Sequence, residues 1–264
     1  MSKAKVIAFA NQKGGVGKTS CVQSIGIGLV RKEKKVLIID VDAQANLSMG
    51  LGFEPDDLEL TISELLDRLR NRETVENMDE YVLHSAEGID LIASDMNLSG
   101  VEIAMQALSI DREFLLKTIV EHFENHYDFI LLDCPPSLGI LTLSALVAAD
   151  EVIIPTQAQL YSVKGSALLV QNISSIQKRL NPGLRITGII ITMVNERTRT
   201  SQALIRDIKM IYGEHVHIFK TAIPQSVKAS ESTYEGKSIF LHDPHGKIAK
   251  AFSSCVEEIL HGEV

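Results

Sequence analysis

The chain has 264 residues, 45% of them hydrophobic and 23% charged, and its formal net charge at pH 7 is −8. This composition is typical of folded globular proteins and excludes an intrinsically disordered chain. Because a chain of this length can bury about three quarters of its unfolded surface in one α/β domain, we expect residues 1–264 to form a single domain.

The sequence shows no segment that predicts secretion or membrane insertion. Its first apolar run, residues 6–10, is too short for a signal peptide, and no later run approaches a transmembrane span. We therefore expect a cytoplasmic protein. Cys21, Cys134 and Cys255 form no CxxC pair, which predicts buried thiols rather than disulfides or a cysteine-bridged cluster.

A glycine-rich loop, which we call the phosphate loop, lies between the first apolar run and a helical pattern over residues 18–32. It reads Lys13-Gly14-Gly15-Val16-Gly17-Lys18-Thr19-Ser20. Strand, glycine loop and helix in this order are the context of a phosphate-binding site, because backbone N–H groups and the helix dipole both point at the anion. An ordinary glycine turn is the alternative.

The side chains of this loop predict separate contacts with a nucleotide. We expect Lys18 to bridge the β- and γ-phosphates and Ser20 to reach the α-phosphate. The Thr19 hydroxyl would complete the shell of a magnesium ion that otherwise keeps mostly water.

The loop departs from the usual GxxxxGK[ST] spacing. Gln12 stands where the first glycine would be, and a second lysine, Lys13, opens the loop. Residues 13–19 resemble the deviant Walker A loop, KGGxGK[ST], of the ParA/MinD ATPase superfamily. The resemblance implies ATP and Mg²⁺ as cofactors and catalytic roles for Lys13 and Lys18. It also implies that Lys13 contacts the nucleotide of a partner subunit, and hence a homodimer in the ATP state.

Two acids follow the next apolar run, residues 36–39, which is typical of a strand buried on both faces. Asp40 and Asp42 would lie at the sheet edge where ligands bind in open α/β folds. The stretch resembles the family's DxDPQ segment, with Ala43 in place of proline, and this gives Asp42 the role of positioning the attacking water. Asp40 is either structural or an indirect partner of the magnesium ion.

The middle of the chain alternates helical and strand patterns. We expect helices over residues 61–72, 98–108 and 112–126, and a strand over residues 89–92. Thr61 and Glu64 have the spacing of a capping box at the start of the first helix.

A buried strand at residues 128–133 ends at Asp133, whose carboxylate can hold magnesium through a water molecule, the Walker B role. Pro135-Pro136-Ser137-Leu138-Gly139 then resembles the family's switch segment, which reports the state of the γ-phosphate. We keep the name switch segment for residues 135–139.

The last third of the chain predicts the nucleoside site. A strand at 151–156, a helix at 163–180 and a strand at 186–191 lead to Asn195, whose amide offers both a donor and an acceptor to adenine. Asn195 matches the family's base-recognition site, although a turn-capping role is the alternative. Residues from 218 resemble the family's next strand and adenine-flanking loop, which places Pro224 on the base.

Strands alternate with helices along the whole chain, which predicts an α/β fold with a doubly wound, mostly parallel sheet flanked by helices. The resemblance makes this a P-loop NTPase of the deviant Walker A type. The short ParA/Soj type is the most similar, because no helix-turn-helix extension precedes the phosphate loop.

The resemblance also implies a function. An ATP-state dimer would bind double-stranded DNA without sequence preference, and a ParB-type centromere-binding protein would stimulate its slow, Mg²⁺-dependent hydrolysis. The protein would then associate with the nucleoid and move plasmids or chromosomes apart.

The charge distribution is compatible with DNA binding, since residues 171–250 are net basic in an otherwise acidic chain. Arg197 matches an exposed arginine of the family's DNA-binding surface, whereas Gln225 replaces a second one. Our candidate DNA-binding residues are Arg197, Arg199, Lys220 and Lys228. Ordinary solvated helix faces are the alternative.

Two other functional classes are alternatives to DNA partitioning. A membrane-surface ATPase resembling MinD needs a basic amphipathic C-terminal helix, but residues 251–260 combine apolar Phe252, Val256 and Ile259 with acidic charges. This predicts a helix docked on its own domain and no membrane partner. A metabolic ATP-dependent ligase or a metal-cluster carrier is disfavoured by the absence of a second-substrate motif and of CxxC.

Overall fold

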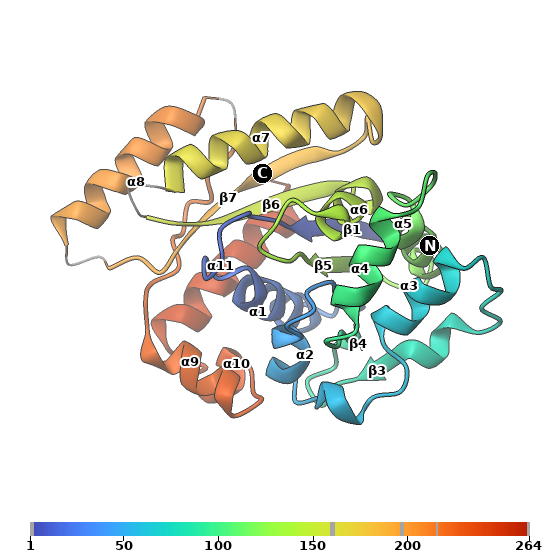
Figure 1. Ribbon diagram of the computed structural model, residues 1–264. Helices are drawn as coiled ribbons and strands as arrows, with labels where there is room; N and C mark the ends of the chain where they lie inside the picture. The colour runs from blue at the N-terminus through green and yellow to red at the C-terminus, as the bar shows by residue number, and fades with distance from the viewer. Residues whose placement is uncertain (1–2, 159–161, 196–197, 215, 263–264) are drawn as a thin grey trace.

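The computed structural model describes residues 3–158, 162–195, 198–214 and 216–262, with the backbone alone over 162–168. In these residues seven strands form one sheet in the order β3-β4-β2-β5-β1-β6-β7 (Figure 1). Six strands pair in parallel, and β3 joins the edge antiparallel to β4. The strands are β1 (Lys5–Phe9), β2 (Val36–Asp40), β3 (Val82–His84), β4 (Asp90–Ile92), β5 (Phe129–Asp133), β6 (Glu151–Gln157) and β7 (Arg185–Thr192).

Helices cover both faces of this sheet (Figure 1). Their bounds are α1 (Lys18–Val30), α2 (Asn46–Gly50), α3 (Ile62–Arg70), α4 (Leu98–Gln106), α5 (Leu115–Phe123), α6 (Ile140–Ala148), α7 (Ser162–Arg179), α8 (Arg199–Tyr212), α9 (Val227–Tyr234), α10 (Ile239–His242) and α11 (Lys247–His261). The predicted α/β fold with a doubly wound, mostly parallel sheet is therefore confirmed.

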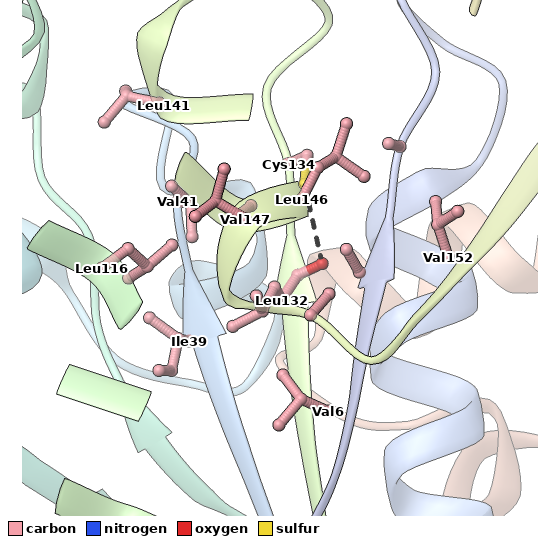
Figure 2. Close-up of a cluster of buried hydrophobic side chains, with 14 of the residues drawn as sticks. Val6, Ile39, Val41, Leu116, Leu132, Cys134, Leu141, Leu146, Val147 and Val152 are labelled. Atoms are coloured by element: carbon pink, nitrogen blue, oxygen red, sulfur yellow. Dashed lines mark hydrogen bonds between the residues drawn. The ribbon is translucent and has the colours of Figure 1, made fainter. Parts of the chain in front are cut away.

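The central strands separate two hydrophobic cores, because successive side chains of a strand point to opposite faces. Ile7 and Ile38 belong to the core under α1 and α11. Val6, Ile39 and Leu132 belong to the other core, where Figure 2 shows them beneath side chains of α5 and α6. Every residue of β2 and β5 is buried, as expected for parallel strands covered on both faces.

The C-terminal helix packs on its own domain, as predicted. α11 lies beside α1 (Figure 1), and Phe252, Val256 and Ile259 are buried in the core that the two helices share. The three cysteines are buried free thiols, which is also as expected.

The predicted capping box at the start of α3 is wrong. The Thr61 hydroxyl donates instead to Asp95, over 3.1 Å, and Glu64 accepts a hydrogen bond from Tyr81. Asp95 lies in the loop after β4 and also accepts from Ser63. The N–H of Ile62 donates to the Ala93 carbonyl, so contacts with the segment after β4 replace the local motif at this helix end.

The strand expected from residue 218 is also wrong in the described residues. Two isolated bridges replace it, one between Ile189 and Ile218 and one between Val194 and Pro224. The short antiparallel strand β3 has no counterpart among the predictions.

Candidate functional site

The phosphate loop lies at the carboxyl edge of the sheet, between the end of β1 and the start of α1. β5 is a neighbour of β1, and the register pairs Phe9 with Asp133. β2 follows on the far side of β5, where Asp40 pairs with Asp133. Three adjacent strand ends therefore bring the loop and the predicted acids to one place.

Two glycines give the loop its turns. Gly15 and Gly17 have φ angles of 68° and 83°, in the left-handed region that other residues rarely adopt. Gly17 is also the N-cap residue of α1. A glycine is needed at both positions because any Cβ there would be strained.

The loop is tied to the neighbouring strands by side chains that the sequence did not single out. Asn11 donates to the Pro155 carbonyl over 2.7 Å and accepts the N–H of Lys13 over 3.0 Å. These contacts join the start of the loop to β6. The loop is therefore held before any ligand arrives, as pre-organised binding requires.

The other end of the loop has two further anchors. The Thr192 hydroxyl donates to the Val16 carbonyl over 2.7 Å, and Gln157 donates to the Gly15 carbonyl over 2.8 Å. Both anchors lie at the carboxyl ends of strands, on β7 and β6. Each directly follows a strand that the sequence predicts, at 151–156 and at 186–191, but the sequence does not indicate which carbonyl it binds.

Lys18 points back into the loop. Its ammonium donates to the Lys13 carbonyl over 3.4 Å, and the residue is only 6% exposed. Burial lowers the pKa of Lys18, while Asp133 and Asp42 act in the opposite direction. A cation held here between buried carboxylates and the loop is placed to bind phosphate oxygens.

Asp133 is buried at the end of β5, 1% exposed. Burial raises its pKa well above the usual range, and the charge of Asp40 raises it further, while Thr19 and Lys18 lower it. Neither carboxylate oxygen has a partner of hydrogen-bond geometry among the described residues. A buried, unsatisfied carboxylate next to a threonine hydroxyl fits a hard divalent cation such as Mg²⁺.

Asp40 and Asp42 have different surroundings. Asp40 is fully buried and accepts the backbone N–H and the hydroxyl of Ser48, over 3.0 and 2.8 Å, and the N–H of Asp42 over 3.2 Å. Burial raises the pKa of Asp40 to about 6. These contacts make Asp40 part of the framework of the loop after β2.

Asp42 is half-buried and accepts the N–H of Gln44 over 3.0 Å. Its charge raises the pKa of both Lys18 and Asp133. Asp42 is thus the more exposed of the two acids, and its water-positioning role remains a prediction.

A cavity of about 990 Å³ opens beside the phosphate loop. Gly17, Ser20, Asn195 and Pro224 are among the residues that line it. The N–H of Gln225 donates to the Val194 carbonyl over 3.0 Å, so the two distant segments are joined at the cavity wall. The structure thus brings the predicted adenine residues next to the predicted phosphate site, with room for a nucleoside.

The predicted DNA-binding cations come from separate segments. Arg199 is the exposed first residue of α8, and Lys220 is exposed with its N–H bonded to Glu258 over 3.0 Å. Lys228, in the first turn of α9, forms an ion pair of 2.8 Å with Asp243. Arg197 lies outside the described residues. The three described cations are therefore exposed, and Lys228 forms an ion pair with Asp243.

The chain is similar in sequence to a known family and to known proteins. The AAA domain family matches residues 4–186. The chain is 38% identical to the chromosome-partitioning ATPase Soj of Treponema pallidum, over 97% of each chain. It is 37% identical to the sporulation initiation inhibitor protein Soj of Bacillus subtilis, over 97% of this chain and 98% of that one.

Among solved structures, a cobyrinic acid a,c-diamide synthase from Mycobacterium smegmatis with bound ATP analogue and magnesium superposes with a TM-score of 0.84. It shares 31% sequence identity, and the match covers 98% of this chain and 96% of that one.

Proposed function

Because this chain belongs to the AAA domain family and, within it, to the ParA/Soj type of the ParA/MinD ATPases, we propose that it is an ATP-dependent switch for DNA partitioning. The observation that carries the proposal is the meeting of the phosphate loop, Lys18 and the unsatisfied carboxylate of Asp133 at three adjacent strand ends. A similar chain binds an ATP analogue with magnesium, which supports the same ligands here.

Each part of the proposed site has its own task. The N–H groups of the phosphate loop and the start of α1 hold the phosphates, and Lys18 neutralises their charge. Thr19 and Asp133 would hold Mg²⁺, which supplies charge neutralisation between the phosphates when it is bound. Asp42 orients the water for in-line attack, and the cavity beside Asn195 and Pro224 holds adenosine.

We further propose that ATP joins two copies of the chain. Lys13 opens the phosphate loop, and the family resemblance gives its side chain a contact with the nucleotide of the partner subunit. If the Lys13 side chain contacts the nucleotide of the partner subunit, the dimer forms only when ATP is bound. Dimers would release DNA when a ParB-type partner stimulates hydrolysis.

Sedimentation velocity with ATP and Mg²⁺, with ADP and without nucleotide tests this proposal. We expect a dimer only with ATP, and Lys13→Ala should still bind ATP yet sediment as a monomer. A matched control is Lys35→Ala, an exposed lysine at the amino end of β2. A parent protein that stays monomeric at saturating ATP, with hydrolysis blocked, would contradict the switch.

DNA binding and membrane binding are separated by adding duplex DNA or anionic vesicles of phosphatidylglycerol to the same samples. We expect ATP-dependent retention of DNA and none of vesicles, since the apolar face of α11 is already buried. No helix in the described part of the chain has both the length and the apolar character needed to cross a membrane.

An amide-forming enzyme is the second candidate, because a synthase is among the similar solved structures. The two functions differ in what ATP turnover needs. A partitioning ATPase turns over ATP without any carboxylate or amine acceptor, and DNA with a ParB-type partner accelerates it. Turnover that appears only with a small carboxylic acid and an amine donor would favour the synthase.

A further inference from the structure

Glu102 lies in α4, and its carboxylate reaches the start of α6. The carboxylate lies beside the first turn of α6, where the N–H of Leu141 lowers its pKa. The same carboxylate lies against Gly139, so closely that a Cβ atom at position 139 would overlap it. Glu102 is half-buried in this position. The contact therefore links two helices that are distant in sequence at the end of the switch segment.

The start of α6 depends on such a contact. Its N-cap residue is Gly139, and no side chain there accepts a hydrogen bond from the first turn. The first N–H groups of a helix need acceptors from outside the helix, and a carboxylate is favoured at the positive end of the dipole. The Glu102 carboxylate, which lies against Gly139, puts a negative charge at this end of α6.

The electrostatic surroundings of Glu102 connect it with the predicted catalytic acid. Burial raises the pKa of Glu102, the negative charge of Asp42 raises it further, and the N–H of Leu141 lowers it. Glu102 therefore lies close enough to Asp42 to sense its charge.

The switch segment connects the start of α6 with the phosphate loop. Pro136 lies against Gly14, since a Cβ atom at position 14 would be 3.8 Å from the Pro136 Cβ. Ser137 turns the segment: its hydroxyl accepts the N–H of Gly139 over 3.3 Å, and its carbonyl accepts the Thr142 hydroxyl over 2.7 Å. A shift of the first turn of α6 would therefore move Pro136 relative to the loop.

We propose that Glu102 is a positioning residue for ATP hydrolysis, whose carboxylate holds the first turn of α6 and so fixes the switch segment against the phosphate loop. The inference rests on the proposed ATPase function. It goes beyond the motifs that carry the family resemblance, because Glu102 belongs to none of them. Its effect is on the rate of hydrolysis rather than on nucleotide affinity.

Substitutions at both sides of the contact test this role in the full-length protein. We expect Glu102→Ala to lower single-turnover ATP hydrolysis about tenfold and to change the affinity for a fluorescent ATP analogue less than about twofold. Glu102→Gln keeps an acceptor oxygen and should stay within about threefold of the parent rate.

Gly139→Ala should be as slow as Glu102→Ala, because its methyl group displaces the carboxylate. The double variant should be no slower than Glu102→Ala, since both changes remove the same contact. Glu121→Ala is the matched control: Glu121 is exposed on α5, and it forms a long ion pair of 4.0 Å with Lys117.

Three results would overturn the inference while leaving the ATPase function intact. They are Glu102→Ala at the parent rate, Glu102→Gln as slow as Glu102→Ala, or a loss of nucleotide affinity and melting temperature in proportion to the rate. A parent protein that binds no ATP with Mg²⁺ would instead remove the proposed function, and this inference with it.

Discussion

The carboxyl edge of the sheet and the C-terminal third of the chain would carry the two halves of the proposed function, and they are built differently. At the sheet edge, Lys18, Asp40 and Asp133 are charged residues with 6% exposure or less, crowded together by the register of β1, β2 and β5. In the C-terminal third, Arg199, Lys220 and Lys228 are exposed and come from separate segments.

This difference determines what each region can do. Buried charges interact strongly because little water screens them, so small displacements matter and each residue has one task. Exposed cations interact weakly and additively with a polyanion, so each contributes little and several can replace one another. Single substitutions should therefore abolish function at the sheet edge and only weaken it in the C-terminal third.

Lys18→Ala tests the sheet edge most severely. We expect nucleotide affinity to fall at least about 100-fold, because a buried charge-assisted contact with the phosphates is lost. ATP-dependent dimerisation should disappear as well. Equilibrium binding of a fluorescent ATP analogue measures the first effect and sedimentation the second. Affinity within a few-fold of the parent would show that the loop backbone alone holds the phosphates.

Asp42→Ala separates binding from hydrolysis within the same region. We expect ATP affinity and the ATP dimer to be retained while single-turnover hydrolysis falls about 100-fold, because the attacking water loses its orientation. Asp56→Ala, an exposed aspartate, is the control. If Asp42→Ala turned over ATP at the parent rate, the water-positioning role would move to Asp40.

The sequence predicts the sheet edge well because its signals are local. The phosphate loop and the two buried strands that end in Asp40 and Asp133 are short stretches in which residue order alone fixes geometry. The anchors of the loop are different: Gln157 and Thr192 are 142 and 176 residues away from the carbonyls that they bind. No local pattern indicates such pairs.

The errors have the same origin. The end of α3 is held by Asp95, 34 residues after Thr61, so the local capping box was the wrong inference. β3 spans only Val82–His84, which is too short for a periodicity to be visible. The sequence leaves two roles open for Asp40, because the contacts of its carboxylate are not visible in a local pattern. In the structure, Ser48, eight residues further on, donates two hydrogen bonds to it.

Asp133→Asn tests whether the buried carboxylates at the sheet edge lower the stability of the fold. Burial raises the pKa of Asp133 and Asp40 in the folded protein, so the folded state binds more protons than the unfolded state. Stability of the nucleotide-free parent should then fall as pH rises from about 4, the unfolded pKa, through about 6, the folded pKa of Asp40.

Removing one of the two charges should therefore stabilise the nucleotide-free protein by about 1–2 kcal/mol at pH 7 and make the pH dependence shallower. Thermal unfolding between pH 4 and 8 measures both effects. Mg²⁺-dependent hydrolysis should be lost in the same variant. A lower melting temperature at pH 7 would show that the buried carboxylate stabilises the fold.

The C-terminal third is tested by comparing two of its cations, with the smallest expected effects. Arg199→Ala should weaken ATP-dependent duplex DNA binding a few-fold and lower the slope of log affinity against log salt by about 1, the loss of one phosphate contact. Lys228→Ala should leave the slope nearly unchanged, because the Lys228 ammonium already lies 2.8 Å from Asp243.

The ion pair is the reason for expecting a difference between two exposed cations. Lys228 must leave Asp243 before it binds a phosphate, whereas the exposed pair itself stabilises the fold by less than about 1 kcal/mol. Lys228→Ala with Asp243→Asn is the matched variant, since it removes the pair without changing the net charge. If Lys228→Ala lowered the salt slope as much as Arg199→Ala, Lys228 would exchange its partner on binding, and the paired cation would belong to the DNA surface after all.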